Sequence, residues 1–262
     1  MKITELYIYP IKSLPGLKIS TSLVTNRGLE YDRRYMFVDP QGQAITQRKH
    51  PKMALIKTAM TPDGFELNFN GEKTLIPFQI STGELMEVDV WGKRCQAIVG
   101  HDEINKAMST FLEIPVRLVY MPEQYFRNIN PIFAQPGDKL SFADGYPLLL
   151  ANEASLNDLN NRLEQSVTMK RFRPNVIFGG TEPFSEDKFQ NISIGNTKFN
   201  ITKPCERCVM ITVNPLTGEK SKEPLKTLST YRLSDNKVMF GVNMIPRSTG
   251  EIKVGDTLST IM

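Results

Sequence analysis

The chain has 262 residues, 40% hydrophobic and 23% charged, which is ordinary for a soluble globular protein of one large or two smaller domains. Its net charge of +4 suits a small anionic ligand and, without a clustered basic stripe, argues against nucleic acid as a partner. Three cysteines are too few for a disulfide framework, no signal peptide precedes the first strand, and no apolar stretch nears the roughly 20 residues of a membrane span, so we expect a cytoplasmic protein without a membrane partner.

The first half of the sequence is rich in strand patterns. Residues 3–9 alternate between apolar and polar side chains, and residues 35–38 and 44–48 flank a turn at 39–42, which predicts a hairpin. Two more hairpins are predicted at Asn70-Gly71, which follows strand 65–69, and at Gly92-Lys93, between strands 86–91 and 95–99. Short strands at close spacing predict a barrel or a sandwich.

Helical patterns are fewer. Helical spacing over residues 102–112, with Asp102 as a candidate cap, predicts one helix. A second is predicted over 152–163, because Asn152 can cap it and Glu153 lies in its first turn. Residues 122–139 are rich in Pro, Gln and Asn, so we expect a long loop there that forms a domain boundary or covers an active site.

Strand patterns return after residue 170. Residues 176–178 end at a pair of glycines, and residues 191–202 form a predicted hairpin around Gly195-Asn196. Further strands are predicted over residues 209–213, 238–242 and 250–258. The whole pattern is that of a mostly β (α+β) protein.

The most informative short motif is Cys205-Glu206-Arg207-Cys208. Two cysteines at this spacing can be half of a zinc knuckle, but no second pair exists, because Cys95 is alone and the two histidines are not paired. They can also be a redox or structural dithiol, or one of them can bind a soft metal as a thiolate. The spacing alone leaves these alternatives open.

Basic residues recur at the ends of predicted strands. Lys12 follows the first strand, Arg33 and Arg34 precede strand 35–38, and Arg171 and Arg173 precede strand 176–178. Charged residues at strand ends are most often solvated. The alternative is that they converge on a phosphate, which Arg binds through a planar fork and Lys through a point charge.

Taken together, the ordered motifs resemble MOSC-domain proteins. The motifs that carry the resemblance are Tyr9-Pro10-Ile11-Lys12-Ser13, Asp32-Arg33-Arg34, Asn152-Glu153-Ala154-Ser155-Leu156, Phe172-Arg173-Pro174-Asn175, Cys205 to Cys208, residues 223–228 and residues 252–256. The set is similar to that of the mitochondrial amidoxime-reducing component and its bacterial YcbX-like relatives. The resemblance implies an N-terminal β-barrel-like domain over residues 1–120, then a MOSC β-barrel with peripheral helices over residues 121–262.

The resemblance also implies a molybdenum cofactor, in which a pyranopterin dithiolene holds the metal, and it gives no reason to expect pyridoxal phosphate. Cys208 matches the family's metal ligand and would be the catalytic residue, since a soft thiolate suits molybdenum. Cofactor contacts carry over to Lys12, Ser13, Arg34, Asp144, Arg173, Asn175 and Arg207. Lys12, Arg34 and Arg173 would neutralise phosphate. Ser13 and Asn175 would form hydrogen bonds to phosphate or pterin, and Asp144 would accept from the pterin or serve only as a turn residue.

Two departures from the family pattern bear on the pterin contacts and the substrate. Gly145 and Tyr146 stand where eukaryotic relatives have small hydroxyl residues, and Glu206 stands where a serine can occur. An acidic Glu206 near an anionic cofactor would be unfavourable unless it points away or pairs with a base.

The implied reaction is the two-electron reduction of a small N-hydroxylated substrate, such as an amidoxime, a hydroxylamine or an N-hydroxylated base. The three cysteines cannot supply the four ligands of an iron–sulfur cluster, so electrons would come from a separate flavin or iron–sulfur reductase. The alternative is a carrier of the molybdenum cofactor or of sulfur, without turnover.

Overall fold

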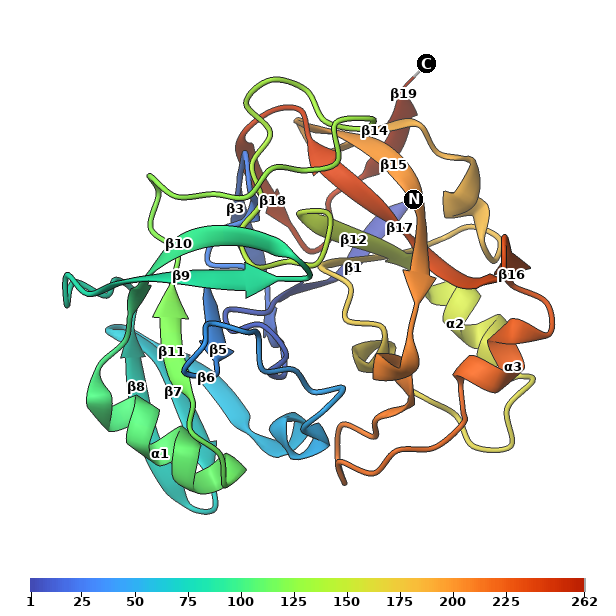
Figure 1. The fold of residues 1–262 in the computed structure, drawn as a ribbon. Coiled ribbons are helices and arrows are strands. Elements are labelled where there is room, and N and C mark those ends of the chain that lie inside the picture. The colour runs from blue at the N-terminus through green and yellow to red at the C-terminus, as the bar shows by residue number, and fades with distance from the viewer. Residues whose placement is uncertain (262) are drawn as a thin grey trace.

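The structure is a computed structural model that describes residues 1–261, and it confirms the expected mostly β fold. The described chain forms four sheets. Sheets built from the first half lie on the left of Figure 1, and the large sheet built mainly from the second half lies on the right.

The largest sheet has nine strands and includes the N-terminal strand of the chain. Its order is β19-β14-β15-β17-β12-β13-β1-β2, with β16 paired to β17, and all its pairs are antiparallel except β12 with β13. The strands are β1 (Lys2–Ile8), β2 (Leu17–Ile19), β12 (Leu148–Asn152), β13 (Val176–Gly179), β14 (Asn191–Ile194), β15 (Thr197–Arg207), β16 (Leu233–Ser234), β17 (Lys237–Pro246) and β19 (Leu258–Ile261).

Three smaller sheets complete the β structure. One has the order β5-β11-β10-β9, with β5 (Tyr35–Val38), β9 (Leu85–Val90), β10 (Lys93–Val99) and β11 (Arg117–Tyr120). The second joins β6 (Lys57–Thr61), β7 (Gly64–Phe69) and β8 (Glu72–Pro77), and the third joins β3 (Thr21–Thr25), β4 (Gly28–Leu29) and β18 (Gly250–Lys253). The hairpins predicted at Asn70-Gly71 and near Gly92 are confirmed as β7–β8 and β9–β10.

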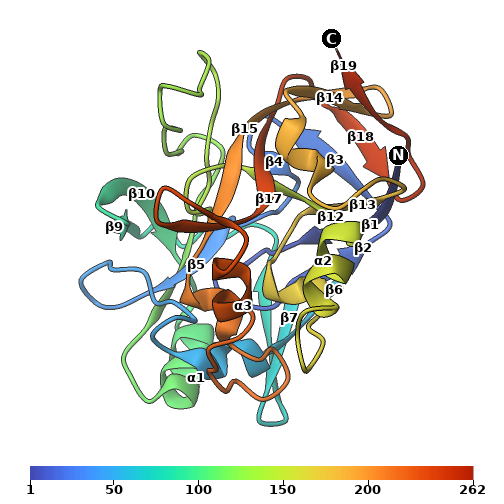
Figure 2. The same cartoon turned by 90° about the vertical axis from the view of Figure 1, so that its right-hand side faces the viewer.

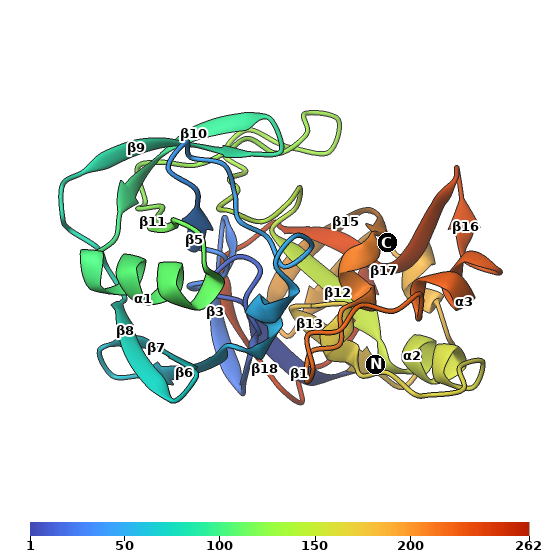
Figure 3. The ribbon, with the colours of Figure 1, turned by 60° about the horizontal axis from the view of Figure 1, so that its bottom comes forward.

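The helices lie at the edges of these sheets. Helix α1 (Asp102–Leu112) packs against β8 and β11, whereas α2 (Glu153–Asn160) and α3 (Leu225–Ser229) lie on the opposite side of the molecule (Figure 3). The predicted cap of α2 is confirmed, because the Asn152 side chain accepts from the Ala154 amide at 3.0 Å. Four 3-10 turns are η1 (Pro51–Leu55), η2 (Met169–Arg171), η3 (Ser185–Lys188) and η4 (Val209–Thr212).

Two strand predictions were wrong. Residues 44–48 form no strand with β5, which pairs with β11 instead, and only an isolated bridge joins Val38 to Ala44. Residues 209–212 form the turn η4 rather than a strand. The chain does return beside β5, since the Ile45 amide donates to the Phe37 carbonyl at 2.8 Å, but the ladder does not continue. Residues 209–212 belong to no strand pair of the described chain.

The two halves of the chain share strands and one core. Strand β1 pairs with β13, and β3 pairs with β18, so N-terminal strands extend sheets of the C-terminal half. One hydrophobic cluster contains Leu6, Phe37 and Val176 together. The N-terminus also contacts the start of β19, where the Leu258 amide donates to the Met1 carbonyl at 3.0 Å. Figure 2 shows the N-terminus and β19 on the same side of the molecule. The boundary at residue 120 stays a prediction, and strand pairing crosses it.

Helices of the described chain are short. Its longest, α1, has 11 residues, and none combines the length and apolar character that crossing a bilayer requires.

Candidate functional site

The site is built around the buried ring of Tyr9, which directly follows β1. Two guanidinium groups lie over this ring, Arg33 at 4.4 Å and Arg173 at 4.3 Å from its centroid. The Tyr9 hydroxyl donates to the Pro174 carbonyl at 3.1 Å, and burial raises the pKa of Tyr9 to about 12. The phenol is therefore neutral near pH 7 and holds the loop before β13 against the end of β1.

The Arg33 guanidinium, on one side of the ring, has both an ion-pair partner and a hydrogen-bond partner. Arg33 forms an ion pair with buried Asp32 at 2.5 Å and donates to the Asn175 amide oxygen at 2.9 Å. Asn175 has no exposed surface, and its amide also donates to Tyr7 O at 3.2 Å and Asp32 at 3.0 Å and accepts from Leu149 N at 3.2 Å. All four of its hydrogen-bonding positions are used. The structure thus places Asn175 in a hydrogen-bond network of the protein, and the cofactor contact that the resemblance implied stays a prediction.

The Arg173 side of the ring is unpaired. Within residues 1–261 the Arg173 guanidinium forms no ion pair and donates no hydrogen bond, although its carbonyl accepts from Arg33 at 3.4 Å. Its backbone is left-handed, with φ at 58°. Desolvation, with the nearby charge of Arg33, lowers the pKa of Arg173 to about 10. An uncompensated, partly desolvated guanidinium at a loop is the chemistry of an anion site.

A second group, which we name the Asp144 cluster, consists of Lys12, Arg48, Trp91 and Asp144. Lys12 is buried, donates to the Phe142 carbonyl at 2.8 Å and pairs with Asp144. Arg48 and the Trp91 indole donate to the same carboxylate at 3.0 and 2.8 Å. The Asp144 carboxylate oxygens, which were expected to accept hydrogen bonds from the pterin, therefore accept hydrogen bonds from side chains of the protein.

The charges of the Asp144 cluster shift its pKa values in opposite directions. Desolvation works to raise the pKa of Asp144, but the Lys12 ammonium, followed by Trp91 and Arg48, holds it below its usual range. Desolvation lowers the pKa of Lys12, although Asp144 opposes that shift. Lys12 is thus balanced by a carboxylate of the same chain, unlike Arg173.

Sequence reasoning missed the role of Trp91. The strand pair Val90–Lys93 leaves Trp91 and Gly92 as a two-residue turn with φ of 59° and 77°, the backbone of a type I′ hairpin. Asn or Asp is usual at the first of these positions, and a bulky residue there is strained. Trp91 is half-exposed, and Arg48 stacks on its ring at 4.4 Å. The signal in the sequence was a tryptophan where a turn residue is expected.

The cysteine motif lies at the end of β15. Arg207 donates to the Cys205 sulfur at 3.0 Å and to the Phe172 carbonyl at 2.7 Å, so it ties β15 to the Arg173 loop. Because residues 205–208 are extended, the two cysteine Cα atoms lie roughly 10 Å apart, too far for a disulfide without movement of the backbone. Within residues 1–261 no group of three His, Cys, Asp or Glu side chains could hold a metal. The geometry favours neither the redox dithiol nor the zinc knuckle.

Cys208 itself is half-buried and directly precedes η4. Its thiol has no hydrogen-bond partner in the described chain, which leaves its sulfur free for a ligand. Glu206 forms ion pairs of 2.8 Å with Lys203 and with Lys237. The negative charge of Glu206, which departs from the family pattern, is therefore balanced by two neighbouring lysines.

Contacts link several of the predicted residues. Arg173 stacks on Tyr9, and Arg207 donates to the carbonyl of Phe172, the residue before Arg173. Lys12 pairs with Asp144, and the charge of Asp144 also acts on the pKa of Arg173. Ser13 follows Lys12, is buried at a φ of 68°, and its hydroxyl has no partner among residues 1–261.

Arg34 does not join this group. It donates to the Met121 carbonyl at 2.6 and 2.9 Å and pairs with Glu123 at 2.5 Å. Arg33, which was not predicted as a cofactor contact, stacks on the Tyr9 ring, and the cofactor contact of Arg34 stays a prediction. The backbone turns at this point, since residues 31–33 form a turn and Arg33 is left-handed with φ at 49°, so the two side chains leave the chain in different directions.

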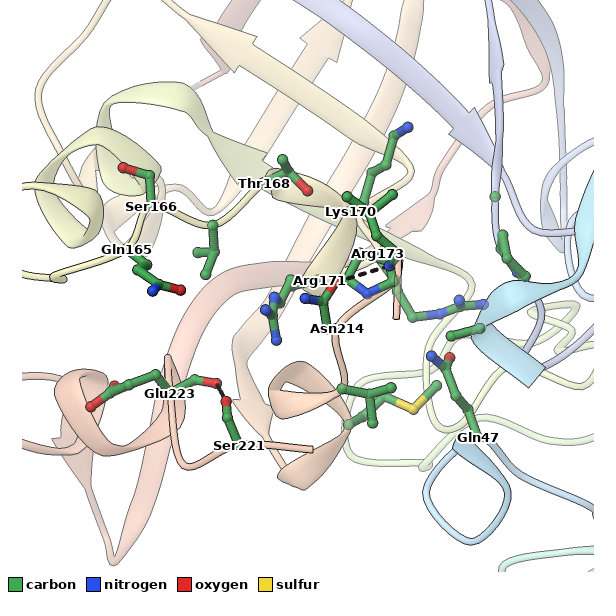
Figure 4. Close-up of a pocket in the computed structure, with 18 of the residues that line it drawn as sticks. Gln47, Gln165, Ser166, Thr168, Lys170, Arg171, Arg173, Asn214, Ser221 and Glu223 are labelled. Atoms are coloured by element: carbon green, nitrogen blue, oxygen red, sulfur yellow. Dashed lines mark hydrogen bonds between the residues drawn. The ribbon is translucent and has the colours of Figure 1, made fainter. Parts of the chain in front are cut away.

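A cleft of about 1070 Å³ opens beside Arg173 (Figure 4). Its walls come from both halves of the chain: residues 54–58 and Gln47 from the first, and residues 162–173 and 210–230 in part from the second. Met210 of η4 lines it, two residues after Cys208. A ligand in the cleft could therefore reach the neighbourhood of the free thiol.

Comparison with known proteins identifies the class. Residues 1–115 match the MOSC N-terminal beta barrel domain, and residues 137–259 match the MOSC domain. The chain belongs to the family of MOSC-domain proteins that carry this N-terminal domain.

Curated relatives make the likeness more specific. The chain is 33% identical to mouse mitochondrial amidoxime-reducing component 1 over 274 residues, which is 97% of this chain and 80% of the relative. It is 32% identical to the human protein of that name, over 97% of this chain and 81% of the relative. A rice molybdenum cofactor sulfurase is 32% identical over 91% of this chain, which spans 32% of that relative.

Proposed function

We propose that the protein binds a molybdenum cofactor through Cys208 and reduces small N-hydroxylated compounds. The family and the names of its relatives support a function connected with this cofactor. The observation that carries the proposal is an unpaired guanidinium, Arg173, that lines the cleft, while Arg207, the residue before the free thiol of Cys208, donates to the Phe172 carbonyl.

The residues present fit such a cofactor. Cys208 offers the soft sulfur that molybdenum prefers, and Arg173 offers an unpaired fork for a phosphate. Ser13 is 5% exposed and its hydroxyl has no hydrogen-bond partner within residues 1–261, and Arg207 has a buried Nε atom without one. These orphaned groups are all donors or acceptors for an anionic, polar ligand. When bound, the cofactor supplies the two-electron redox chemistry.

The remaining residues position this site rather than react. Arg207 ties Cys205 to the Phe172 carbonyl and so fixes the strand that leads to Cys208. Arg33, Asp32 and Asn175 fix the loop that carries Arg173. Tyr9 is no proton donor near neutral pH, since burial raises its pKa to about 12. Water is therefore the proposed source of protons.

The overall reaction consumes two electrons and two protons, which convert an N–OH group into N–H and release water. The electrons would come from a separate flavin or iron–sulfur reductase. A cytoplasmic location stays a prediction, which cell fractionation would test.

Substitution of Cys208 tests the ligand assignment. Cys208→Ala should lose nearly all bound molybdenum and all reduction of benzamidoxime with a chemical electron donor, while its thermal unfolding stays like that of the wild type. Cys205→Ala is the matched control and should keep its molybdenum. Metal analysis and circular dichroism measure both. Unchanged molybdenum in Cys208→Ala would refute the assignment.

The alternative function is transfer of cofactor or sulfur without turnover, and likeness to the rice molybdenum cofactor sulfurase favours it. A persulfide on Cys208, found by mass spectrometry in protein that holds the cofactor but reduces no amidoxime, would support this alternative over the reductase.

A further inference from the structure

Three segments around the mouth of the cleft concentrate positive charge. Residues 47–57 carry four basic and no acidic side chains, residues 162–173 four basic and one acidic, and residues 214–226 three basic and two acidic. Parts of all three line the cleft, and together they hold a net charge of +8, against +4 for the whole chain. Three of the cations have carboxylate partners outside the segments. These pairs are Arg48–Asp144, Lys52–Glu113 and Arg162–Asp158. The remaining +5 still exceeds the charge of the whole chain.

Exposed lysines form the outer part of this charge. We name as the basic rim the lysines of the three segments that are exposed and form no ion pair within residues 1–261. They are Lys49, Lys57, Lys170, Lys220, Lys222 and Lys226. The charges of Lys49 and Lys220, with that of Lys52, add to burial in lowering the pKa of His50. A surface of this sign attracts an acidic partner and accelerates its association.

Two exposed leucines lie at the same mouth. Leu55 is 41% exposed at the end of η1, Leu216 is 84% exposed, and both line the cleft. Their segments are in contact, because the Cβ position at Gly218 lies 3.6 Å from the Leu55 side chain. A basic surface with apolar side chains has the composition of a protein–protein interface, which combines an apolar centre with a polar rim. Nucleic acid would meet the same surface chiefly through its phosphates.

The loop that carries Leu216 is held in place. The Asn214 amide donates to the Glu219 carbonyl at 2.8 Å, which closes the loop. Lys220 donates to the Arg48 carbonyl at 2.7 Å and ties the loop to the segment before η1. Figure 1 shows the two segments side by side at the lower edge of the molecule. Because the leucine is already positioned, a partner that buries it loses little conformational entropy.

This surface is also close to the proposed metal ligand. Cys208 directly precedes η4, whose first residue, Val209, is 52% exposed. The four residues of η4 span about 8 Å at the rise of a 3-10 helix, so Cys208 lies within roughly 15 Å of Asn214, where the loop begins. A protein docked on the loop therefore brings its own redox group near Cys208 without entering the cleft.

We propose that the basic rim, with Leu55 and Leu216 as its apolar part, docks an acidic electron-transfer protein. This inference rests on the proposed function and names the surface that the electron donor uses. The docked protein is oxidised by two electrons for each N–OH group reduced to N–H and water. No bond forms or breaks at the docking surface itself.

Binding of electron carriers of opposite charge tests the surface without reference to turnover. A flavodoxin and a plant-type ferredoxin are acidic carriers with a flavin and an iron–sulfur cluster, whereas cytochrome c is a basic carrier. In calorimetric titration at low ionic strength, at least one acidic carrier should bind the purified protein and cytochrome c should not. Lys49→Glu/Lys222→Glu should weaken that binding about tenfold. Failure of both acidic carriers to bind, or equal binding of cytochrome c, would overturn the proposal.

A matched double variant separates the surface from net charge. The side chains of Lys49 and Lys222 form no hydrogen bond or ion pair within residues 1–261, so their replacement should leave the fold intact. Lys188→Glu/Lys198→Glu reverses two exposed lysines of η3 and β15 that do not line the cleft. It changes the net charge equally and should leave binding within about twofold of the wild type. An equal loss in both double variants would refute the docking surface.

Leu216 distinguishes a protein partner from nucleic acid. Leu216→Ser should weaken binding of the acidic carrier about tenfold, because the docked protein buries the leucine, and should leave the salt dependence of binding unchanged. A duplex oligonucleotide is the competing probe. If it displaces the carrier and binds Leu216→Ser as tightly as the wild type, the basic rim is a nucleic-acid surface and the proposal is wrong.

Turnover separates this inference from the proposed function. With the molybdenum-loaded protein and a sub-saturating reduced carrier, Lys49→Glu/Lys222→Glu should reduce benzamidoxime about tenfold more slowly than the wild type. With a small chemical electron donor the two rates should be equal. Carrier-driven rates that the variant leaves unchanged refute the inference alone. Binding of the carrier that depends on the basic rim, in a protein that reduces no amidoxime with either donor, refutes the reductase and leaves the docking surface.

Discussion

The two sides of the Tyr9 ring carry the same group in opposite situations. Arg33 and Arg173 stack on it at nearly equal distances, 4.4 and 4.3 Å. Arg33 is paired with Asp32 and bonded to Asn175, whereas Arg173 has no such partner in the described chain. The comparison teaches that charge alone does not mark a ligand site. The guanidinium that the fold leaves unbalanced is the one available for an anion, and the balanced one holds the fold together.

The largest effect on stability is expected from the balanced arginine. Arg33→Gln leaves the Asp32 carboxylate, whose side chain is 1% exposed, buried without its ion pair, which should lower the free energy of unfolding by about 3 kcal/mol. Urea denaturation measures the loss. Arg94→Gln breaks an exposed pair with Glu87 and should cost less than about 0.5 kcal/mol. Equal losses in the two variants would contradict the structural role of Arg33.

The destabilisation in Arg33→Gln should also depend on pH. Burial already raises the pKa of Asp32, and loss of Arg33 raises it further. A carboxyl group with a raised folded-state pKa binds more protons when folded, so stability falls as the pH rises between its unfolded and folded pKa values. We therefore expect a smaller loss at acidic than at neutral pH, as denaturation curves across that range would show.

An intermediate effect is expected at Asp144, whose side chain is 54% exposed. Asp144→Asn should lower the free energy of unfolding by at most about 1 kcal/mol at pH 7, since solvent screens the partly exposed pairs. The folded-state pKa of Asp144 is lowered, so its contribution is complete above the unfolded value, about 3.9, and disappears as the pH falls below it. Wild type and variant should therefore converge in acid, and a gap that widens there would count against the ion pairs.

The smallest effect on stability is expected from the unbalanced arginine. Arg173→Gln removes a guanidinium that forms no direct ion pair within residues 1–261, so its free energy of unfolding should stay within about 0.5 kcal/mol of the wild type. Its molybdenum content should nevertheless fall. Denaturation and metal analysis on the same preparation measure both. A variant as unstable as Arg33→Gln, or one with full molybdenum, would remove the distinction between the two sides of Tyr9.

Much of the fold could be predicted because its signals are local. The turns at Asn70-Gly71 and Gly92, the span of α1 and the cap of α2 all follow from neighbouring residues. Residues 44–48 and 209–213 were wrongly predicted as strands. An apolar run becomes a strand only where a second strand can pair with it. That partner is set by tertiary structure.

The site was predictable only in outline. Arg173 stacks on Tyr9 and Lys12 pairs with Asp144. That Arg33 and not Arg34 lies at Tyr9 depends on the left-handed turn at Arg33, which the sequence does not announce. The sequence also could not predict that all four hydrogen-bonding positions of the Asn175 side chain are used within the protein. Its amide donates to Tyr7 and Asp32 and accepts from Leu149, three residues from separate parts of the chain.

The placement of β1 and β3 has a consequence for how such proteins diversify. Both N-terminal strands are integral to sheets completed by β13 and β18. A chimaera that joins residues 137–259 to a foreign leader would leave those sheet edges open, and open edges favour aggregation. Recombination within this architecture is therefore expected to exchange whole chains, so that new substrates arise by substitution along the cleft walls and not by shuffling of modules.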